Sequence, residues 1–280
     1  MMRFGEFRKS EDTMFEHMTV EQGFKRAKKF LAAEEIKPLS FADLYGEGEV
    51  AKDEEYVVKM EEEFERAHSP ETRETQQLAT IFEAVIHDNA DMSEWFGPGA
   101  EAIKPSRFDD IKNGVDTIVE IQEDDRSASH LGLAIDATFS QDMDKKFARI
   151  RKEIGQGELA KVKYFQSEHL GIRGELSKLP RVVVGADAKT IKELNELWLE
   201  GKKRDLGKHP VQFQILEEIV LQLETFRRYA EEQNQKELAI IYERTRTLVA
   251  GILHEKHKQV KDSGERDQVY YAIQSNLSAF

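Results

Sequence analysis

The sequence predicts a mixed α/β protein in which helices enclose a small sheet. Two stretches in the middle of the chain, GVDTIVEIQ and HLGLAIDATFS, alternate apolar and polar residues with the period of a half-buried strand. Longer segments on both sides repeat their apolar residues at helical spacing. A chain of 280 residues also has room for a sizeable core, and it contains no cysteine, so no disulfide holds it together.

The N-terminal part of the chain is predicted to be helical. A first helix covers residues 1–38, and an acidic, turn-rich connector covers 39–55. The segment EYVVKMEEEFERAH carries one apolar stripe and forms a second helix. A third helix over 70–88 begins with a serine cap followed by proline, which is tolerated in the first turn. The glycines and prolines of WFGPGAEAIKPS predict a loop after this helix, with a short helix at its end.

The central part of the chain changes to strand periodicity. Strands are predicted over 114–122, 130–140, 160–167 and 179–187, with a helix from Ser140 to a glycine-bearing end at 155–157 between the second and the third. Together with the preceding helix, these elements predict a mixed sheet of about four to five strands. The last strand is a continuous apolar run, which indicates burial on both faces.

The remainder of the chain is predicted to be helical, over 188–203, 210–232 and 235–261, with a short helix at the end. The two long helices are expected to form an antiparallel pair that covers the sheet; the second arrangement open to them is a homodimer. The expected organisation is an N-terminal helical segment (1–69), an α/β core (70–187) and a C-terminal helical region (188–280).

Composition excludes several function classes. The absence of cysteine removes thiolate metal sites and cysteine nucleophiles. A net charge of -13 argues against a protein that coats nucleic acid without sequence preference, although residues 141–181 are locally basic. No apolar run is long enough to span a membrane, and the N-terminus lacks the apolar region of a secretory signal, so we expect a cytoplasmic protein without a membrane partner.

Three acidic residues lie at one end of the predicted core. Glu83 is on the helix that precedes the strands, Asp116 opens the first strand, and Asp136 interrupts the apolar pattern of the second. An acid in a buried strand costs several kcal/mol, on the order of 2–7, unless it is paired or ligated. Converging carboxylates bind hard cations, so a Mg²⁺ or Mn²⁺ site is expected here. The alternative for each acid is an ordinary turn, strand-edge or helix-surface residue.

These residues resemble the PD-(D/E)xK nuclease-like superfamily over about 71–187. The family core has the order α-β-β-β-α-β, with a glutamate on the first helix, an aspartate on the second strand and (D/E)-x-K on the third. Glu83, Asp116 in NGVD and Asp136 in AIDAT occupy those places in that order. The resemblance implies that Asp116 and Asp136 bind metal, and that Asp110 in FDDIKNGVD assists them.

The sequence departs from the family pattern at the motif lysine, where it has Thr138. Some members of the family supply the lysine from the following helix, which makes Lys145 or Lys146 the replacement. Lys161 and Lys163 on the next strand are further candidates. Without a replacement, the chain would be similar to members that keep the fold and lose cleavage.

A basic run on the helix after the second strand is the candidate nucleic-acid contact. We expect phosphate contacts from Lys145, Lys146 and Arg149, together with Lys161 and Lys163 on one strand face. The alternative is the polar side of an amphipathic helix, balanced by neighbouring acids.

The sequence therefore leads to two functional hypotheses. The first is a Mg²⁺- or Mn²⁺-dependent endonuclease, acting on DNA in preference to RNA, with Glu83, Asp116, Asp136, Lys146 and Lys163 as its catalytic residues. The second is an inactive protein on the same fold that binds a nucleic acid or a protein partner, and Thr138 is the feature that favours it.

Overall fold

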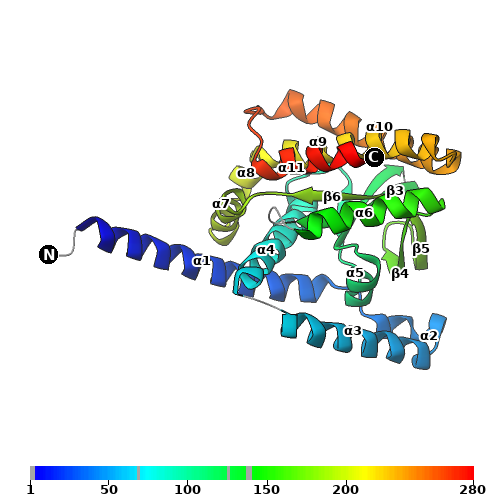
Figure 1. The fold of residues 1–280 in the computed structure, drawn as a ribbon, viewed down its shortest axis with the longest axis horizontal. Coiled ribbons are helices and arrows are strands. Elements are labelled where there is room, and N and C mark those ends of the chain that lie inside the picture. Colours follow the sequence, from blue (N-terminus) through cyan, green and yellow to red (C-terminus); the bar gives the residue numbers. More distant parts are fainter. Residues whose placement is uncertain (1–3, 68–69, 125–126, 137–140) are drawn as a thin grey trace.

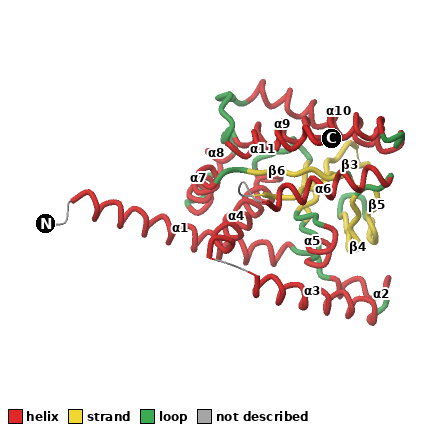
Figure 2. The backbone as a smooth tube through the Cα atoms, viewed as in Figure 1, coloured by secondary structure: helices red, strands yellow, loops and turns green. Residues whose placement is uncertain are grey.

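The computed structural model describes residues 4–67, 70–124, 127–136 and 141–280. Its longer helices lie on both sides of the central sheet in the sequence and enclose it in space (Figures 1 and 2). The helices are α1 (Phe4–Glu34), α2 (Ala42–Tyr45), α3 (Glu47–Ala67), α4 (Pro70–Met92), α5 (Arg107–Asn113), α6 (Gln141–Gln156), α7 (Ala188–Leu199), α8 (Lys203–Leu206), α9 (Val211–Glu232), α10 (Lys236–Gln259) and α11 (Gln268–Asn276), with short 3-10 turns at Pro38–Phe41 and Leu277–Ala279.

The main sheet has four strands in the order β1-β2-β3-β6. Strands β1, β2 and β3 form an antiparallel meander, and β6 joins β3 in parallel after the α6 crossover. These four strands are β1 (Ala100–Ile103), β2 (Thr117–Asp124), β3 (Ser127–Asp136) and β6 (Arg181–Gly185). The order α4-β1-β2-β3-α6-β6 confirms the predicted mixed fold with an α-β-β-β-α-β core, flanked by helices at both ends.

Two sequence predictions of local structure are wrong. Residues 100–103 form strand β1 rather than a loop. The strand has only four residues, and Gly97, Pro98 and Gly99 directly before it are typical of a loop. Strand β4 (Ala160–Ser167) does not enter the main sheet. It pairs with β5 (Ile172–Leu179), which falls almost entirely outside the predicted strands because its side chains are largely exposed and polar. The resulting hairpin packs its apolar side on β2.

Helix α3 also begins earlier than predicted, at Glu47, within the segment expected to be a connector. Acidic residues in its first turn favour a helix start because they interact with the positive end of the helix dipole. Helix α3 lies beside α5, α2 packs against α3, and α1 extends away from the core toward its N-terminal end (Figure 1).

Strand β6 is the edge of the sheet, and α9 covers that edge with side-chain amides. The side chain of Gln222 accepts a hydrogen bond from the Val183 N–H at 2.8 Å and donates one to the Val183 carbonyl at 2.6 Å. One and two turns earlier, Glu218 accepts from the Gly185 N–H and Gln214 donates to the Gly185 carbonyl. The backbone N–H and carbonyl groups of Val183 and Gly185, which would otherwise be unpaired at the edge of the sheet, therefore have hydrogen-bond partners inside the protein.

The two long C-terminal helices pack against each other and on the core, which is the first of the two predicted arrangements. Apolar residues of α9 are buried along most of its length. Dimerisation through these helices stays a prediction. In the described part of the chain, no helix is both long and apolar enough to cross a membrane.

The amide contact to β6 predicts a large stability effect. We expect Gln222→Met to lower the free energy of unfolding by about 2–4 kcal/mol, because it leaves the N–H and the carbonyl of Val183 buried without partners. Gln259→Met, on the exposed end of α10, is the matched control and should change it by less than about 0.5 kcal/mol. Urea denaturation measures both, and equal effects would contradict the role given to Gln222.

Candidate active site

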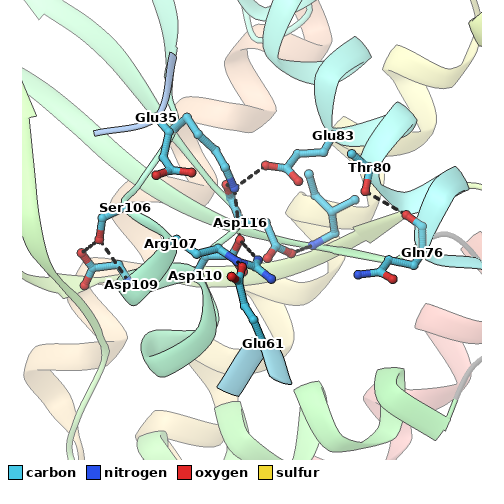
Figure 3. A network of polar contacts seen from close by, with 12 residues as sticks. Glu35, Glu61, Gln76, Thr80, Glu83, Ser106, Arg107, Asp109, Asp110 and Asp116 are labelled. Carbon is cyan, nitrogen blue, oxygen red and sulfur yellow. Dashed lines mark hydrogen bonds and ion pairs between the residues drawn. The ribbon is translucent and has the colours of Figure 1, made fainter. Parts of the chain in front are cut away.

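The centre of the candidate site is the ammonium group of Lys104, which follows β1. Its side chain is 5% exposed, and Nζ lies 2.6 Å from Oε1 of Glu83 on α4. The same nitrogen lies 3.3 Å from Oδ2 of Asp110 and donates to the main-chain carbonyl of Asp116 at 3.0 Å. Lys104 therefore joins α4, α5 and the residue before β2 at one point. Figure 3 shows Glu83, Asp110 and Asp116 close together there.

Glu83 is held at this point by packing. Neighbouring residues of α4, among them Phe82 and Ile86, are fully buried in the core. The Glu83 side chain is 13% exposed. Its buried Oε1 forms an ion pair with the Lys104 ammonium, whose charge lowers the pKa of the glutamate and so opposes the effect of burial. Lys104 is therefore the partner of this carboxylate inside the protein.

Asp110 is positioned by the short helix α5, which is capped by Ser106. Its carboxyl group hydrogen-bonds to that of Asp116. Its Oδ2 also accepts a hydrogen bond from Nη1 of Arg107 at 2.8 Å. Two carboxyl groups in direct contact share one proton, unless a cation stands between them. Asp110 and Asp116 therefore form the closest acidic pair of the site.

Asp116 is oriented by the strand beside it and by the turn before it. Its Oδ2 accepts the N–H of Ile135 on β3 at 2.6 Å. The preceding turn contains Gly114, whose φ of 66° is in the left-handed region. An added Cβ there would lie 2.8 Å from Nη1 of Arg149 and 3.1 Å from Nη1 of Arg181, so only glycine suits the position.

The environment changes the acidity of all three carboxyl groups. Burial raises the pKa of Glu83 to about 7 and that of Asp116 to about 6, and the neighbouring acids add to both shifts. The cations Lys104 and Arg107 outweigh burial at Asp110 and hold its pKa below the usual range. The site therefore retains protons near neutral pH that a bound cation would displace.

Two of the predicted cations lie near these acids. The Lys146 ammonium, on α6, donates to the main-chain carbonyl of Ile135, and its charge lowers the pKa of Asp116. Lys145 is exposed on the same helix. Arg149 donates to the Lys112 carbonyl at 2.9 Å, and it lines a cavity of about 420 Å³ together with Lys161.

Lys163 lies on β4, beside α5, and among the contacts of the described residues its ammonium pairs with α3 rather than with Glu83, Asp110 or Asp116. Its ammonium lies 2.5 Å from Oδ2 of Asp53 and 3.4 Å from Oε1 of Glu49, both on α3. The exposed Lys161 is on the same strand. These contacts hold α3 on the hairpin, and the role of Lys163 in catalysis and nucleic-acid binding stays a prediction.

The backbone of Asp136 ends β3 and pairs with Gly185 of β6. Asp136 directly follows Ile135, which contacts both Asp116 and Lys146. The position is therefore next to the acidic pair. The Asp136 side chain and all of Thr138 lie outside the part of the chain that the structure describes.

The oxygen donors of the site suit a hard divalent cation. Asp110 and Asp116 are in contact, and the buried Glu83 carboxylate lies near them on the other side of Lys104, so the donors are carboxylate oxygens of the kind that hard cations prefer. The three ligand oxygens do not gather as closely as in a ready-made site, because the Lys104 ammonium stands among them. The residues thus fit Mg²⁺ or Mn²⁺ at the Asp110–Asp116 pair.

A second group of metal-type ligands lies elsewhere. Among the described side chains, Glu217, His257 and Asp262 place three ligand atoms within 4.8 Å of one another. Arg266 already forms ion pairs of 2.6 Å with both acids. A cation of the protein therefore satisfies this group.

Sequence reasoning missed three members of the site. Lys104 and Arg107 lie in the segment predicted as a loop with a short helix at its end, and His87 is one turn after Glu83. Among the described residues, the buried Nε2 of His87 has no hydrogen-bond partner, and burial and the Lys104 charge lower the pKa of His87 to about 4. Glu83 and His87 are four residues apart and therefore share one face of the helix, a spacing that could have pointed to His87. No sequence pattern pointed to the lysine or the arginine.

Comparison with protein-family models, curated proteins and solved structures finds no match for this chain.

The shifted pKa of Glu83 predicts a pH dependence of stability. The folded protein holds this proton up to a pH of about 7, whereas an unfolded glutamate releases it near about 4.3. Because the native state binds more protons between these values, the free energy of unfolding falls as pH rises through this window and levels off above it.

Replacing Glu83 with glutamine removes that proton-binding group. Urea denaturation in EDTA between pH of about 4.5 and about 7 should therefore give a shallower fall for Glu83→Gln than for the natural protein. Parallel curves for the two proteins would contradict the buried environment described for Glu83.

Proposed function

We propose that this protein is a Mg²⁺- or Mn²⁺-dependent nuclease that hydrolyses phosphodiester bonds, with DNA as its preferred substrate. The observation that carries the proposal is the contact of the Asp110 and Asp116 carboxyl groups at the sheet end where Glu83 and Lys146 also lie. The strand order and the position of each acid agree with the resemblance to PD-(D/E)xK nucleases.

In this proposal Asp110, Asp116 and Asp136 hold the cation. A divalent ion at such oxygens lowers the pKa of a bound water and stabilises negative charge on a phosphate. Lys146 takes the role of the missing motif lysine, because its ammonium is fixed on β3 beside Asp116. Lys145 and Arg149 contact phosphates of the nucleic acid farther from the cleaved bond.

Glu83 is proposed as a proton-exchanging group. Its raised pKa means that it carries a proton part of the time near neutral pH. Lys104 is a permanent counter-ion, because its contacts with Glu83 and Asp110 hold the pKa of its ammonium above the usual value despite burial. The positive charge of Lys104 thereby offsets the electrostatic repulsion between the acids when no metal is bound.

A specific observation also favours the second candidate function, an inactive protein on the same fold. Lys104 already supplies a positive charge to Glu83 and Asp110, and Thr138 occupies the place of the motif lysine. If that charge replaces the metal, the chain binds nucleic acid or a protein partner without cutting it. The two candidates differ in whether the acidic pair takes up a divalent ion.

Cleavage assays test the first candidate directly. We expect the natural protein with Mn²⁺ to cut labelled DNA, and Asp116→Asn and Asp136→Asn each to slow cutting on the order of 100-fold or more. Asp144→Asn, an exposed acid on α6, is the matched control and should leave the rate unchanged. Cutting that survives both site substitutions would exclude this site, and parallel reactions with RNA would determine the substrate preference.

Metal binding is predicted to stabilise the fold in a pH-dependent way. Near a hundredfold excess of Mn²⁺ over its Kd, the Tm should rise by about 5 °C. The rise should be small at a pH of about 5, where Asp116 keeps its proton, and full above a pH of about 7. Differential scanning fluorimetry measures this shift.

The metal experiment has a built-in comparison between the two acidic groups. Asp116→Asn should abolish the Mn²⁺ effect, whereas Glu217→Gln, in the group already paired with Arg266, should preserve it. If Glu217→Gln abolished the Mn²⁺ effect and Asp116→Asn preserved it, the metal site would lie at Glu217, and the role proposed for the acidic pair would be wrong.

A further inference from the structure

Arg107 connects the candidate active site to the N-terminal helix α3. Its Nη1 donates to Oδ2 of Asp110 at 2.8 Å, and its Nε donates to Oε1 of Glu61 at 2.9 Å. Its Nη2 makes no hydrogen bond within the described residues, and the side chain is 35% exposed. The guanidinium therefore lies at the edge of the site with one side on a proposed metal ligand and the other on a carboxylate (Figure 3).

Glu61 is near the point where α3 leaves the core. Earlier residues anchor the helix, because Val50 and Asp53 are buried and Tyr56 packs edge-on against Phe108 of α5. The six residues from Glu61 to Arg66 are all exposed. Four of these residues are acidic: Glu61, Glu62, Glu63 and Glu65.

The chemistry of the contact is that of an anion bound to an arginine. The guanidinium fork binds carboxylates and phosphates with the same donor geometry. A nucleic acid that reached the acidic pair would place a phosphate within the range of Arg107, and it would meet the charge of Glu61 there. Like charges at such a distance repel, so one anion has to yield to the other.

We propose that Arg107 binds a backbone phosphate of the nucleic acid, and that Glu61 occupies Arg107 in the free protein and must be displaced. The proposal rests on the proposed nuclease function and assigns a substrate-binding residue to it. Glu61 is 49% exposed, and ion pairs in water contribute about 0–1 kcal/mol, so the exchange is easy. Because α3 is anchored before Glu61, the exchange releases only the acidic end of the helix.

Binding to a short fluorescein-labelled DNA duplex tests the proposal, measured by fluorescence anisotropy in EDTA at low ionic strength. Glu61→Gln should bind the duplex about two- to five-fold more tightly than the natural protein, which corresponds to the strength of one exposed ion pair. Glu62→Gln is the matched control: it removes the same charge one residue away, from a side chain that pairs with Arg66 instead. It should change the affinity by much less.

A double-mutant cycle separates the specific contact from general charge. Arg107→Gln should weaken binding, and adding Glu61→Gln to it should then have no further effect, because the competing pair no longer exists. Equal gains for Glu61→Gln and Glu62→Gln, or a Glu61→Gln gain that persists without Arg107, would overturn the proposal. Thermal unfolding of each variant checks that the fold is intact.

The outcome is distinguishable from that of the cleavage assay. If DNA is cut and Glu61→Gln changes nothing, the nuclease proposal stands and the role of Arg107 is wrong. If no DNA is cut but the cycle shows the coupling, Arg107 binds nucleic acid in a protein that does not cleave it.

Discussion

The buried ammonium of Lys104 is the interaction on which the rest of the site depends. It holds Glu83 of α4, Asp110 of α5 and the carbonyl of Asp116 around one nitrogen. A buried charge is tolerated only when it is fully paired, and removing one partner costs about 3–5 kcal/mol. Lys104 thus assembles the three acidic residues, and its ammonium stands between the carboxylates of Glu83 and Asp110.

The frame around this point fixes the direction of each acid. Arg181 donates to the carbonyls of Asn113 and Gly114, and so ties the turn before Asp116 to the first residue of β6. Strand β6 is in turn held along its outer edge by the amides of α9. Helix α9 therefore supports the site indirectly, since it is bonded to the edge strand β6 whose first residue holds the turn before Asp116.

The sequence was sufficient for much of this fold and for part of the site. Regular alternation revealed β2 and β3, and spacing placed Glu83 and Asp116 at the same end. The assignment of 160–167 to the main sheet failed, because periodicity reports which faces are buried and not which strand is the partner. Lys104 and Arg107 were missed for a related reason, since their roles arise only when distant segments meet.

The central claim is that a divalent cation binds between Asp110 and Asp116. Anomalous diffraction from crystals grown with Mn²⁺ near neutral pH locates the ion directly. The account predicts a peak within bonding distance of both carboxylates, with Lys104 still bound to Glu83. A peak only at Glu217, His257 and Asp262, or none at the acidic pair, would contradict it.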